Sequence, residues 1–224
     1  MMLILASNSP RRRELLALGG WTFQVAPVEI DEQPLPSEDP LTYVLRLAES
    51  KARAAAAQFD PEAIAAAIFL AADTTVADGG RILGKPQDAA EAERMLRSLR
   101  GRTHQVFTGL AVYHPASGAL LTDGCLTEVP LRAYSDEEML AYIASGDPLD
   151  KAGAYAIQHA GFKPVLHISG CYANVMGLPL CHLARLLATL GFALQAGVAQ
   201  ACQSSLDYSC PIYVQVLGAQ VHTF

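Results

Sequence analysis

An aspartate at the end of a buried apolar run is the residue best placed to do chemistry in this sequence. The run from Ala67 to Ala72 predicts a strand that ends at Asp73. A turn at Gly79-Gly80 then returns the chain toward Lys85. Ligands of open α/β sheets bind at strand ends, and a carboxylate that faces an ammonium group suits a metal-bound phosphate. The alternative is an ordinary hairpin with an exposed ion pair.

A cluster of arginines marks a second candidate site. A short strand from Leu3 to Ala6 and the turn Ser7-Asn8-Ser9 precede a predicted helix from Pro10 to Leu18. The free amides and the positive dipole end of a helix start attract anions, and Arg11, Arg12 and Arg13 add full charges there. Because cations at a helix start are locally unfavourable, we favour an anion site over a solvated basic turn.

Two further groups have the chemistry to complete such a site. Asp31 and Glu32 lie in a loop and could supply hard oxygen ligands for Mg²⁺ or Mn²⁺. Lys51 falls on the apolar stripe of a helix that is predicted from the N-cap Asp39 to about Gln58. Its ammonium group either extends to the rim of the protein or projects into a cleft to meet a phosphate.

The loop DPLDKAGAYAIQ, residues 147–158, is the second chemically dense segment. Asp150 and Lys151 are followed by small residues that allow a ligand to approach the backbone. Gln158 offers both a donor and an acceptor, as recognition of a base edge requires, although a plain surface glutamine is the alternative. His104 and His182 are isolated in the sequence and are expected to be structural or exposed.

Composition describes a globular protein. The 224 residues are 51% hydrophobic and 17% charged, which is ample for a core, and the net charge of −6 gives no general attraction to nucleic acid or to anionic membranes. The five cysteines are an odd number without zinc-type spacing, which predicts free thiols in a reducing cytosol. No apolar run reaches the length of a membrane span, so we expect a soluble, cytoplasmic protein.

The remaining pattern alternates strands and helices. Strands are expected at Trp21–Val28, Thr103–Tyr113, Ala119–Arg132 and Val165–Ser169, helices at Asp88–Leu99, Ser135–Ser145 and Pro179–Gly191, and a loop at Tyr172–Leu178. From about Gln195 the chain lacks Lys, Arg and Glu. This tail is expected either to add an edge strand through Ile212 to Leu217 or to be poorly ordered.

These segments together resemble the Maf family of nucleoside triphosphate pyrophosphatases from Leu3 to about Gly191. The matching segments are LASNSPRRRELL, DEQPLP followed by YVLRLAESKA, AADTTVADGGRILGKP, LRGRTHQVFTG, and GDPLDKAGAYAIQ followed by VMGLPL. The resemblance implies an α/β fold with a strongly curved mixed sheet and flanking helices, in two lobes around a central cleft. It also implies a domain at residues 1–194 with a C-terminal extension at 195–224, and often a homodimer. The chain departs from the family pattern at His159, where relatives usually have glycine, and in the tail.

The family resemblance also assigns roles. Members cleave nucleoside triphosphates to the monophosphate and pyrophosphate with a divalent cation, Mg²⁺ or Mn²⁺. By position, Asp73 matches the catalytic acid that accepts the proton of the attacking water and can also touch the metal, and Glu32 matches a residue near the metal. The residues that match the triphosphate ligands are Ser7, Arg11, Arg12, Lys51 and Lys85. Asp73-Thr74, Arg11 and Gln158 inside DKAGAYAIQ resemble the branch that prefers dTTP and UTP, and Asp150 with Lys151 is expected to take part in binding the substrate.

Two functions remain open at this point. One is a pyrophosphatase that removes dTTP, UTP or modified pyrimidine nucleotides. The other is a nucleotide-responsive regulator of septum formation in cell division, in which hydrolysis is incidental. The presence of Asp73, Glu32 and Lys85 together favours the enzyme, because a protein that only binds nucleotide does not need a base.

Overall fold

A six-stranded mixed sheet forms the middle of the molecule. The computed structural model describes residues 2–60, 62, 64, 66–192 and 197–219. The strands lie in the order β2-β1-β3-β5-β6, and β4 pairs with β3. Pairing is parallel among β2, β1 and β3 and antiparallel elsewhere. Their bounds are β1 Met2–Leu5, β2 Phe23–Val25, β3 Ala67–Asp78, β4 Arg81–Leu83, β5 Thr103–His114 and β6 Ala119–Pro130.

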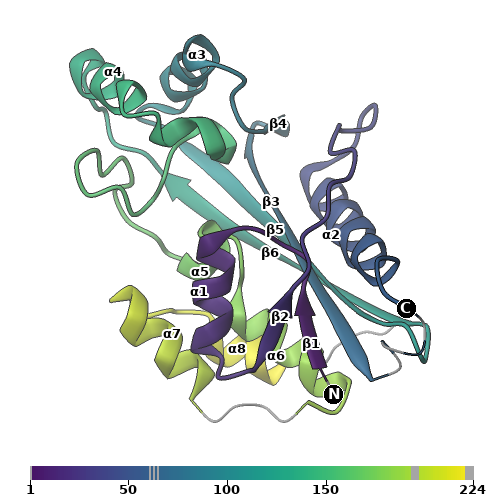
Figure 1. Ribbon diagram of the computed structural model, residues 1–224. Coiled ribbons are helices and arrows are strands. Elements are labelled where there is room, and N and C mark those ends of the chain that lie inside the picture. Colours follow the sequence, from purple (N-terminus) through teal and green to yellow (C-terminus); the bar gives the residue numbers. More distant parts are fainter. Residues whose placement is uncertain (1, 61, 63, 65, 193–196, 220–224) are drawn as a thin grey trace.

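Helices cover the sheet at both ends (Figure 1). The α-helices are α1 Pro10–Leu18, α2 Pro40–Ala56, α3 Ala89–Leu99, α4 Asp136–Ala144, α5 Tyr172–Val175, α6 Leu180–Thr189, α7 Val198–Leu206 and α8 Tyr213–Gly218, with two 3-10 turns, η1 Asp147–Asp150 and η2 Ala152–Ala154. Local signals begin several of them: Asp39 and Asp88 cap α2 and α3, and Ser135 and Glu138 form a capping box on α4. No helix in the described part of the chain combines the length and apolar character that crossing a bilayer requires.

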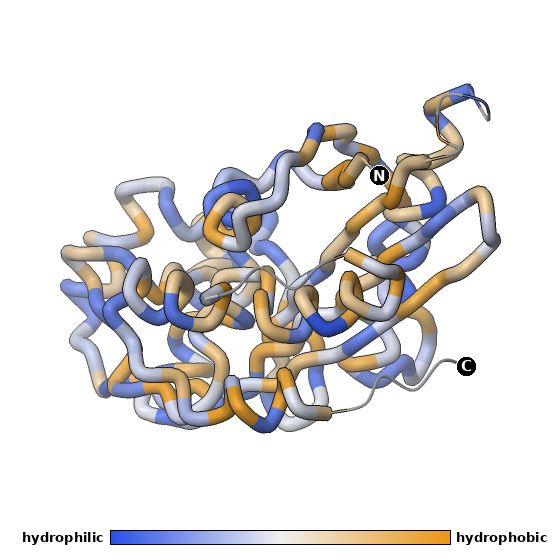
Figure 2. Tube along the Cα trace, turned by 90° about the horizontal axis from the view of Figure 1, so that it is seen from below, coloured by the Kyte–Doolittle hydropathy of each residue, from blue (hydrophilic) through white to orange (hydrophobic). Residues whose placement is uncertain are grey.

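The helices and the sheet form two lobes. One lobe holds α3 and α4 at one end of the long strands, and the other holds α1 and α5–α8 beside β1 and β2 (Figure 1). Each lobe has its own apolar cluster, and hydrophobic and hydrophilic stretches alternate along the chain (Figure 2). The predicted fold class, a mixed α/β sheet with flanking helices in two lobes, is therefore confirmed.

Strand β3 distributes its side chains to two different environments. Because side chains alternate along a strand, Phe69 and Ala71 pack on the side of α2, whereas Leu70 and Ala72 pack on the side of α1 and α6. The same alternation sends Asp73 toward α2 and Thr74 toward α1. Two consecutive residues thus reach opposite faces of one strand.

The edge of β3 next to Asp73 lies between two other strands. Pairing with β1 ends at Leu70, and pairing with β4 begins only at Val76. On the opposite edge β5 pairs continuously from Phe69 to Ala77. The strand is therefore held firmly on one side, while the stretch around Asp73 is left without a ladder partner from β1 or β4.

A glycine lets α2 approach the sheet beside Asp73. Gly109 pairs with Asp73 across the β3–β5 ladder. A Cβ atom at Gly109 would lie 2.6 Å from the backbone carbonyl of Val44 in α2. A side chain there would push the helix away, so this glycine sets the distance between α2 and the strand that carries the aspartate.

Several expected elements differ in the structure. Asp73 does not end its strand, because the β5 ladder continues past it and extends β3 to Asp78. The expected strand Val165–Ser169 reduces to one bridge between Val165 and Leu131, since β6 has already ended at Pro130. The expected loop at Tyr172 to Leu178 contains the short helix α5, and the expected strand at Trp21 to Val28 is limited to β2.

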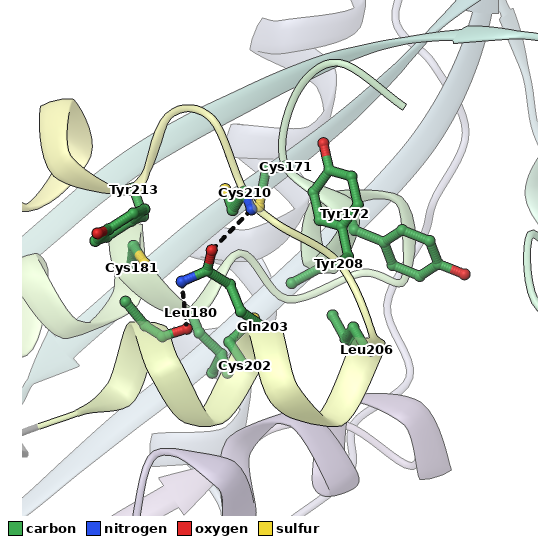
Figure 3. A pocket seen from close by; sticks show the side chains of 12 residues that line it. Cys171, Tyr172, Leu180, Cys181, Cys202, Gln203, Leu206, Tyr208, Cys210 and Tyr213 are labelled. Atoms are coloured by element: carbon green, nitrogen blue, oxygen red, sulfur yellow. Dashed lines mark hydrogen bonds between the residues drawn. The ribbon is translucent and has the colours of Figure 1, made fainter. Parts of the chain in front are cut away.

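The tail forms helices, so the expectation of an edge strand or a disordered tail is wrong for residues 197–219. Val198, Cys202 and Leu206 recur every four residues and face the apolar core of the lobe that holds α1 and α5–α8. Gln203 ties α7 to the segment that leads to α8, because its side chain donates to Ala199 O within α7 and accepts from Cys210 N beyond it (Figure 3). The expected domain boundary at 194–195 lies outside the described residues.

The cysteines gather where the tail meets the rest of the chain, although the sequence scatters them. Cys171 and Cys181 line a pocket of about 20 Å³ together with Cys202 and Cys210 from the tail (Figure 3). All five cysteines are free thiols, as expected. Burial raises the pKa of Cys181 and of Cys202 to about 12, so both stay protonated at neutral pH.

Candidate active site

A buried lysine between two carboxylates is the centre of the candidate site. Lys51 Nζ lies 2.5 Å from Asp73 Oδ1 and 2.5 Å from Glu32 Oε1. Asp73 and Lys51 are 7% and 8% exposed, whereas the Glu32 side chain is half exposed. Three segments that are distant in the sequence therefore meet at one ammonium group, which the sequence could not show.

Burial and charge compete at the two carboxylates. Burial raises the pKa of Asp73, and the charges of Lys51 and Arg12 oppose this without cancelling it. Burial also acts to raise the pKa of Glu32, but the hydrogen bond and charge of Lys51, with the charges of Lys85 and Arg12, outweigh it, and the net shift is downward. The pKa of Asp73 is thus shifted toward easier uptake of a proton, which is the direction that favours a proton acceptor.

Arg12 turns inward from the start of α1. Its Nε donates to Gly177 O at 2.9 Å, and its two terminal nitrogens reach Ser7 Oγ at 3.4 Å and Thr74 Oγ1 at 3.2 Å. Burial lowers the pKa of Arg12, although an arginine stays protonated over the working range of proteins. The start of α1 is capped by Ser9, whose Oγ accepts from Arg12 N. One arginine thus joins the first turn of α1 to β3 and to the loop after α5.

A chain of hydroxyl groups fixes Thr74. Its Oγ1 accepts from Arg12 and lies 2.9 Å from Thr108 Oγ1, and Thr108 donates to Asn174 O at 3.0 Å. Because Thr108 donates its hydroxyl proton to Asn174 O, Thr74 is the donor in the hydrogen bond between the two threonines. The Thr74 hydroxyl therefore has two protein partners in this structure, and its expected contact with a pyrimidine stays a prediction.

Arg11 and Lys85 are the two other cations that were predicted for this site. Neither has an ion pair within the described residues, and Lys85 is exposed. The charge of Lys85 reaches Glu32, and the charge of Arg11 acts on Tyr142 in the other lobe. Asp73 and Glu32 balance Lys51 and Arg12, so the two remaining cations give the site a positive excess that suits a polyanion.

Asp150 and Lys151 form a separate cluster. Lys151 Nζ lies 2.6 Å from Asp147 O, 3.0 Å from Asp147 Oδ1 and 2.6 Å from Asp150 Oδ1. All of these partners belong to the same turn, which is held against β4 by a hydrogen bond from Gly153 N to Gly84 O. Lys151 would have to leave this turn to bind a phosphate, so its expected role stays a prediction.

Gln158 lines a pocket of about 500 Å³ whose lining does not include Asp73 or Glu32. The pocket is of the size that small ligands occupy, and its wall includes Tyr172 and Tyr208. Gln158 is exposed and has no side-chain hydrogen bond among the described residues, so both of its polar atoms are available to a ligand.

The two isolated histidines are structural, as expected. His104 is buried, and its Nε2 lies 2.8 Å from Tyr155 Oη. His182 lies 2.9 Å from Asp123, which also binds Arg185. Within the described residues no group of three or more His, Cys, Asp or Glu could hold a metal ion. A cation at Asp73 and Glu32 would therefore depend on substrate oxygens for its remaining ligands, which is how Mg²⁺ usually binds beside phosphates.

Sequence reasoning missed the residues that support the site from behind. Thr108 and Asn174 are fully buried, and Asn174 also donates to Val106 O and to Thr127 Oγ1. The available signals were a polar Thr108 and a Gly109 inside an apolar strand, where a glycine often marks the close approach of another backbone. Asn174 gave no signal, because its partners lie 47 or more residues away.

The fold and the site together define an α/β protein with a buried carboxylate–lysine pair and further cations at its sheet. The chain belongs to the Maf family, described as Maf-like protein, which matches residues 2–190.

Curated relatives and one solved structure are similar to this chain. The dTTP/UTP pyrophosphatase of Citrifermentans bemidjiense is 48% identical over 189 residues, 84% of this chain and 95% of its own. The dTTP/UTP pyrophosphatase of Anaeromyxobacter dehalogenans is 48% identical over 86% of this chain and 95% of its own length. That of Chromobacterium violaceum is 47% identical over 85% of this chain and 95% of its own length. The structure of the Staphylococcus aureus Ham1 protein is similar over 75% of this chain and 81% of its own, with a TM-score of 0.43 and 14% identity.

Proposed function

We propose that this chain is a nucleoside triphosphate pyrophosphatase. It hydrolyses dTTP, UTP and modified pyrimidine nucleotides to the monophosphate and pyrophosphate. The observation that carries the proposal is the buried Asp73 held by Lys51 beside the free cations Arg11 and Lys85. Membership of the Maf family and the names of relatives at about 48% identity support the substrate class.

In the proposed reaction Asp73 takes a proton from the attacking water. The water oxygen forms a bond to the α-phosphorus, the bond to the bridging oxygen breaks, and pyrophosphate leaves with the electron pair. Lys51 fixes the carboxylate of Asp73 through its short hydrogen bond. Arg11, Arg12 and Lys85 offset the negative charge of the triphosphate, with Ser7 and Thr74 orienting Arg12.

A divalent cation, Mg²⁺ or Mn²⁺, fits the site next to Asp73 and Glu32. When bound, it makes the water more acidic and offsets phosphate charge. Both carboxylates supply the hard oxygen atoms that such a cation prefers. Gln158 is proposed to meet the base, and Asp150 with Lys151 to border the substrate.

The proposal extends to the setting of the enzyme. We propose a homodimer in the cytoplasm with no nucleic-acid or membrane partner, in which residues 1–194 form the catalytic domain and residues 195–224 an extension. Size-exclusion chromatography with light scattering tests the dimer: a single species of about 48 kDa, twice the chain mass of 23.9 kDa, is expected.

The test is turnover of a panel of nucleoside triphosphates with Mg²⁺ or Mn²⁺, in which pyrophosphate and orthophosphate are measured separately. Pyrophosphate release concentrated on dTTP and UTP is the expected result. Release of orthophosphate would refute the cleavage site. Nucleotide binding without any release would instead favour a nucleotide-responsive regulator.

A further inference from the structure

The pocket that contains Gln158 is closed on one side by the C-terminal extension. The segment 157–168 supplies most of its wall, α5 supplies Tyr172, and the extension supplies Tyr208. The Tyr172 and Tyr208 rings are 5.5 Å apart between centroids, at an interplanar angle of 43°. Two aromatic rings and a free amide side chain therefore line one space of about 500 Å³.

Several contacts hold Tyr208 in this wall. Helix α7 ends at Leu206 and is followed by Asp207, whose φ of 46° is left-handed. A hydrogen bond from Tyr208 N to Gln203 O closes the turn. The phenol oxygen lies 3.0 Å from Ile168 O and 2.8 Å from Gly170 O, so its proton has an acceptor within the wall itself. The ring is thus fixed before any ligand arrives.

The pocket lies along the same two segments that support the candidate active site. The segment that begins at Tyr172 ends at Gly177, whose carbonyl accepts from Arg12 Nε. The loop that leads to Gln158 passes Gly153, which packs so closely on Val76 that a Cβ atom there would lie 2.9 Å from its side chain. Val76 is three residues beyond Asp73 on β3. Tyr172 and Gln158, which line the pocket, thus each lie five residues along the chain from a residue that contacts the site or its strand, Gly177 and Gly153.

We propose that Tyr208 forms an aromatic wall of the base pocket, so that the C-terminal extension takes part in substrate binding. This inference rests on the proposed function. The Tyr208 ring would contact the face of the pyrimidine, while Gln158 meets its edge. The family match ends at residue 190, and the relatives align with 84–86% of this chain, so this wall comes from a segment beyond the match.

The experiment compares four variants in the full-length chain. Tyr208→Ala removes the ring, Tyr208→Leu fills the space without a ring, and Tyr208→Phe keeps the ring. Tyr213→Ala is the matched control, because Tyr208 and Tyr213 of the same extension both line the 20 Å³ pocket with the cysteines, whereas only Tyr208 also lines the pocket of Gln158 (Figure 3). We would measure kcat and KM for pyrophosphate release from dTTP and UTP, and binding of dTMP and of inorganic tripolyphosphate by calorimetry. Thermal unfolding verifies that each variant folds.

Tyr208→Ala and Tyr208→Leu are expected to weaken dTMP binding and to raise KM for dTTP about tenfold, the scale of one lost stacking contact. Tripolyphosphate binding stays unchanged, because it has no base. Tyr208→Phe and Tyr213→Ala stay within about threefold of the wild type.

Equal dTMP affinity in Tyr208→Leu and the wild type would overturn the inference, and so would an equal loss in Tyr213→Ala or in tripolyphosphate binding. Failure of the proposed function looks different. A wild type that binds dTMP but releases no pyrophosphate refutes the hydrolysis and leaves the role of Tyr208 to be decided by the dTMP titrations. A wild type that binds no dTMP overturns the base pocket itself.

Discussion

Two lysines in this protein each bridge two carboxylates, and the two clusters differ in almost everything else. Lys51 and Lys151 both have side chains that are 10% exposed. Lys51 joins Asp73 and Glu32, which lie 22 and 19 residues away along the chain, whereas Lys151 joins Asp147 and Asp150 of its own turn. The first cluster needs the folded protein in order to exist, and the second needs only one turn.

The environments of the acids explain why only one cluster is suited to catalysis. Burial raises the pKa of Asp73. Asp147 is subject to the same effect, but the hydrogen bonds from Tyr142 and Lys151 outweigh it and lower its pKa. A lowered pKa indicates a carboxylate whose ionised form is stabilised by its surroundings. A raised pKa indicates a carboxylate that takes up a proton more readily. Similar residue types thus form the proposed catalytic centre in one place and hold a turn in the other.

Replacing the two acids should give the largest contrast. We expect Asp73→Asn to lower kcat at least about 10³-fold, because an amide cannot accept the proton. The matched change Asp147→Asn should keep kcat within about threefold. The free energy of unfolding of Asp73→Asn should change by less than about 2 kcal/mol, since Lys51 keeps Glu32 as a partner. Steady-state kinetics and urea unfolding measure both, and an active Asp73→Asn would refute the role of Asp73.

Removing each lysine tests the same contrast from the cationic side. Lys51→Met leaves the buried Asp73 without its ion pair, and we expect kcat to fall about 100-fold and stability to fall by about 3 kcal/mol. Lys151→Met removes contacts within one turn only. We therefore expect stability to fall by less than about 1 kcal/mol and kcat to change by less than about threefold.

A raised KM in Lys151→Met with unchanged kcat would show that Lys151 leaves its turn to bind the triphosphate. Denaturant unfolding and kinetics on dTTP separate the two outcomes. If Lys51→Met and Lys151→Met lose equal activity, the proposal that only the cluster around Lys51 takes part in catalysis is wrong.

The contrast also shows what the sequence can and cannot predict. Local signals were reliable: the N-cap Asp39, the capping box of Ser135 and Glu138 and the start of α1 at Pro10 lie where they were expected. Asp73 was identified, but its place in the middle of β3 was not. The length of that strand depends on β5, whose pairing partner cannot be read from the run 67–72 alone.

Features that depend on distant partners were missed for the same reason. The relay from Thr74 through Thr108 to Asn174 joins three segments. The prediction for the tail was wrong because it rested on the lack of charge, although Val198, Cys202 and Leu206 have helical spacing and pack on the core of the lobe that holds α1 and α5–α8. The family resemblance predicts the roles of the site residues, and the structure shows which residues contact them.

The pH dependence should separate the two clusters further. The pKa of Asp73 is raised in the folded protein, so its free-energy contribution favours folding below the pKa of the unfolded chain and is lost as the pH rises through the folded value. The pKa of Asp147 is lowered, so its contribution is present above the unfolded pKa and is lost as the pH falls through the folded value.

Activity requires ionised Asp73 and should therefore fall on the acid side, about tenfold per pH unit, at a pH above the ordinary aspartate range while the protein stays folded. A profile of kcat/KM beside circular dichroism at each pH measures this. An acid limb that coincides with unfolding would contradict the assignment of the limb to Asp73.

The smallest expected effects are at the two exposed acids, Glu32 and Asp150, whose side chains are 50% and 73% exposed. Glu32→Gln should lower kcat/KM about tenfold, and excess Mn²⁺ should restore part of it, because a weakened metal ligand is compensated by mass action. Asp150→Asn should stay within about twofold at every metal concentration. Metal titrations of pyrophosphate release compare the two. If Asp150→Asn loses as much activity as Glu32→Gln, the turn that carries Lys151 contacts the substrate, and the two clusters belong to a single site.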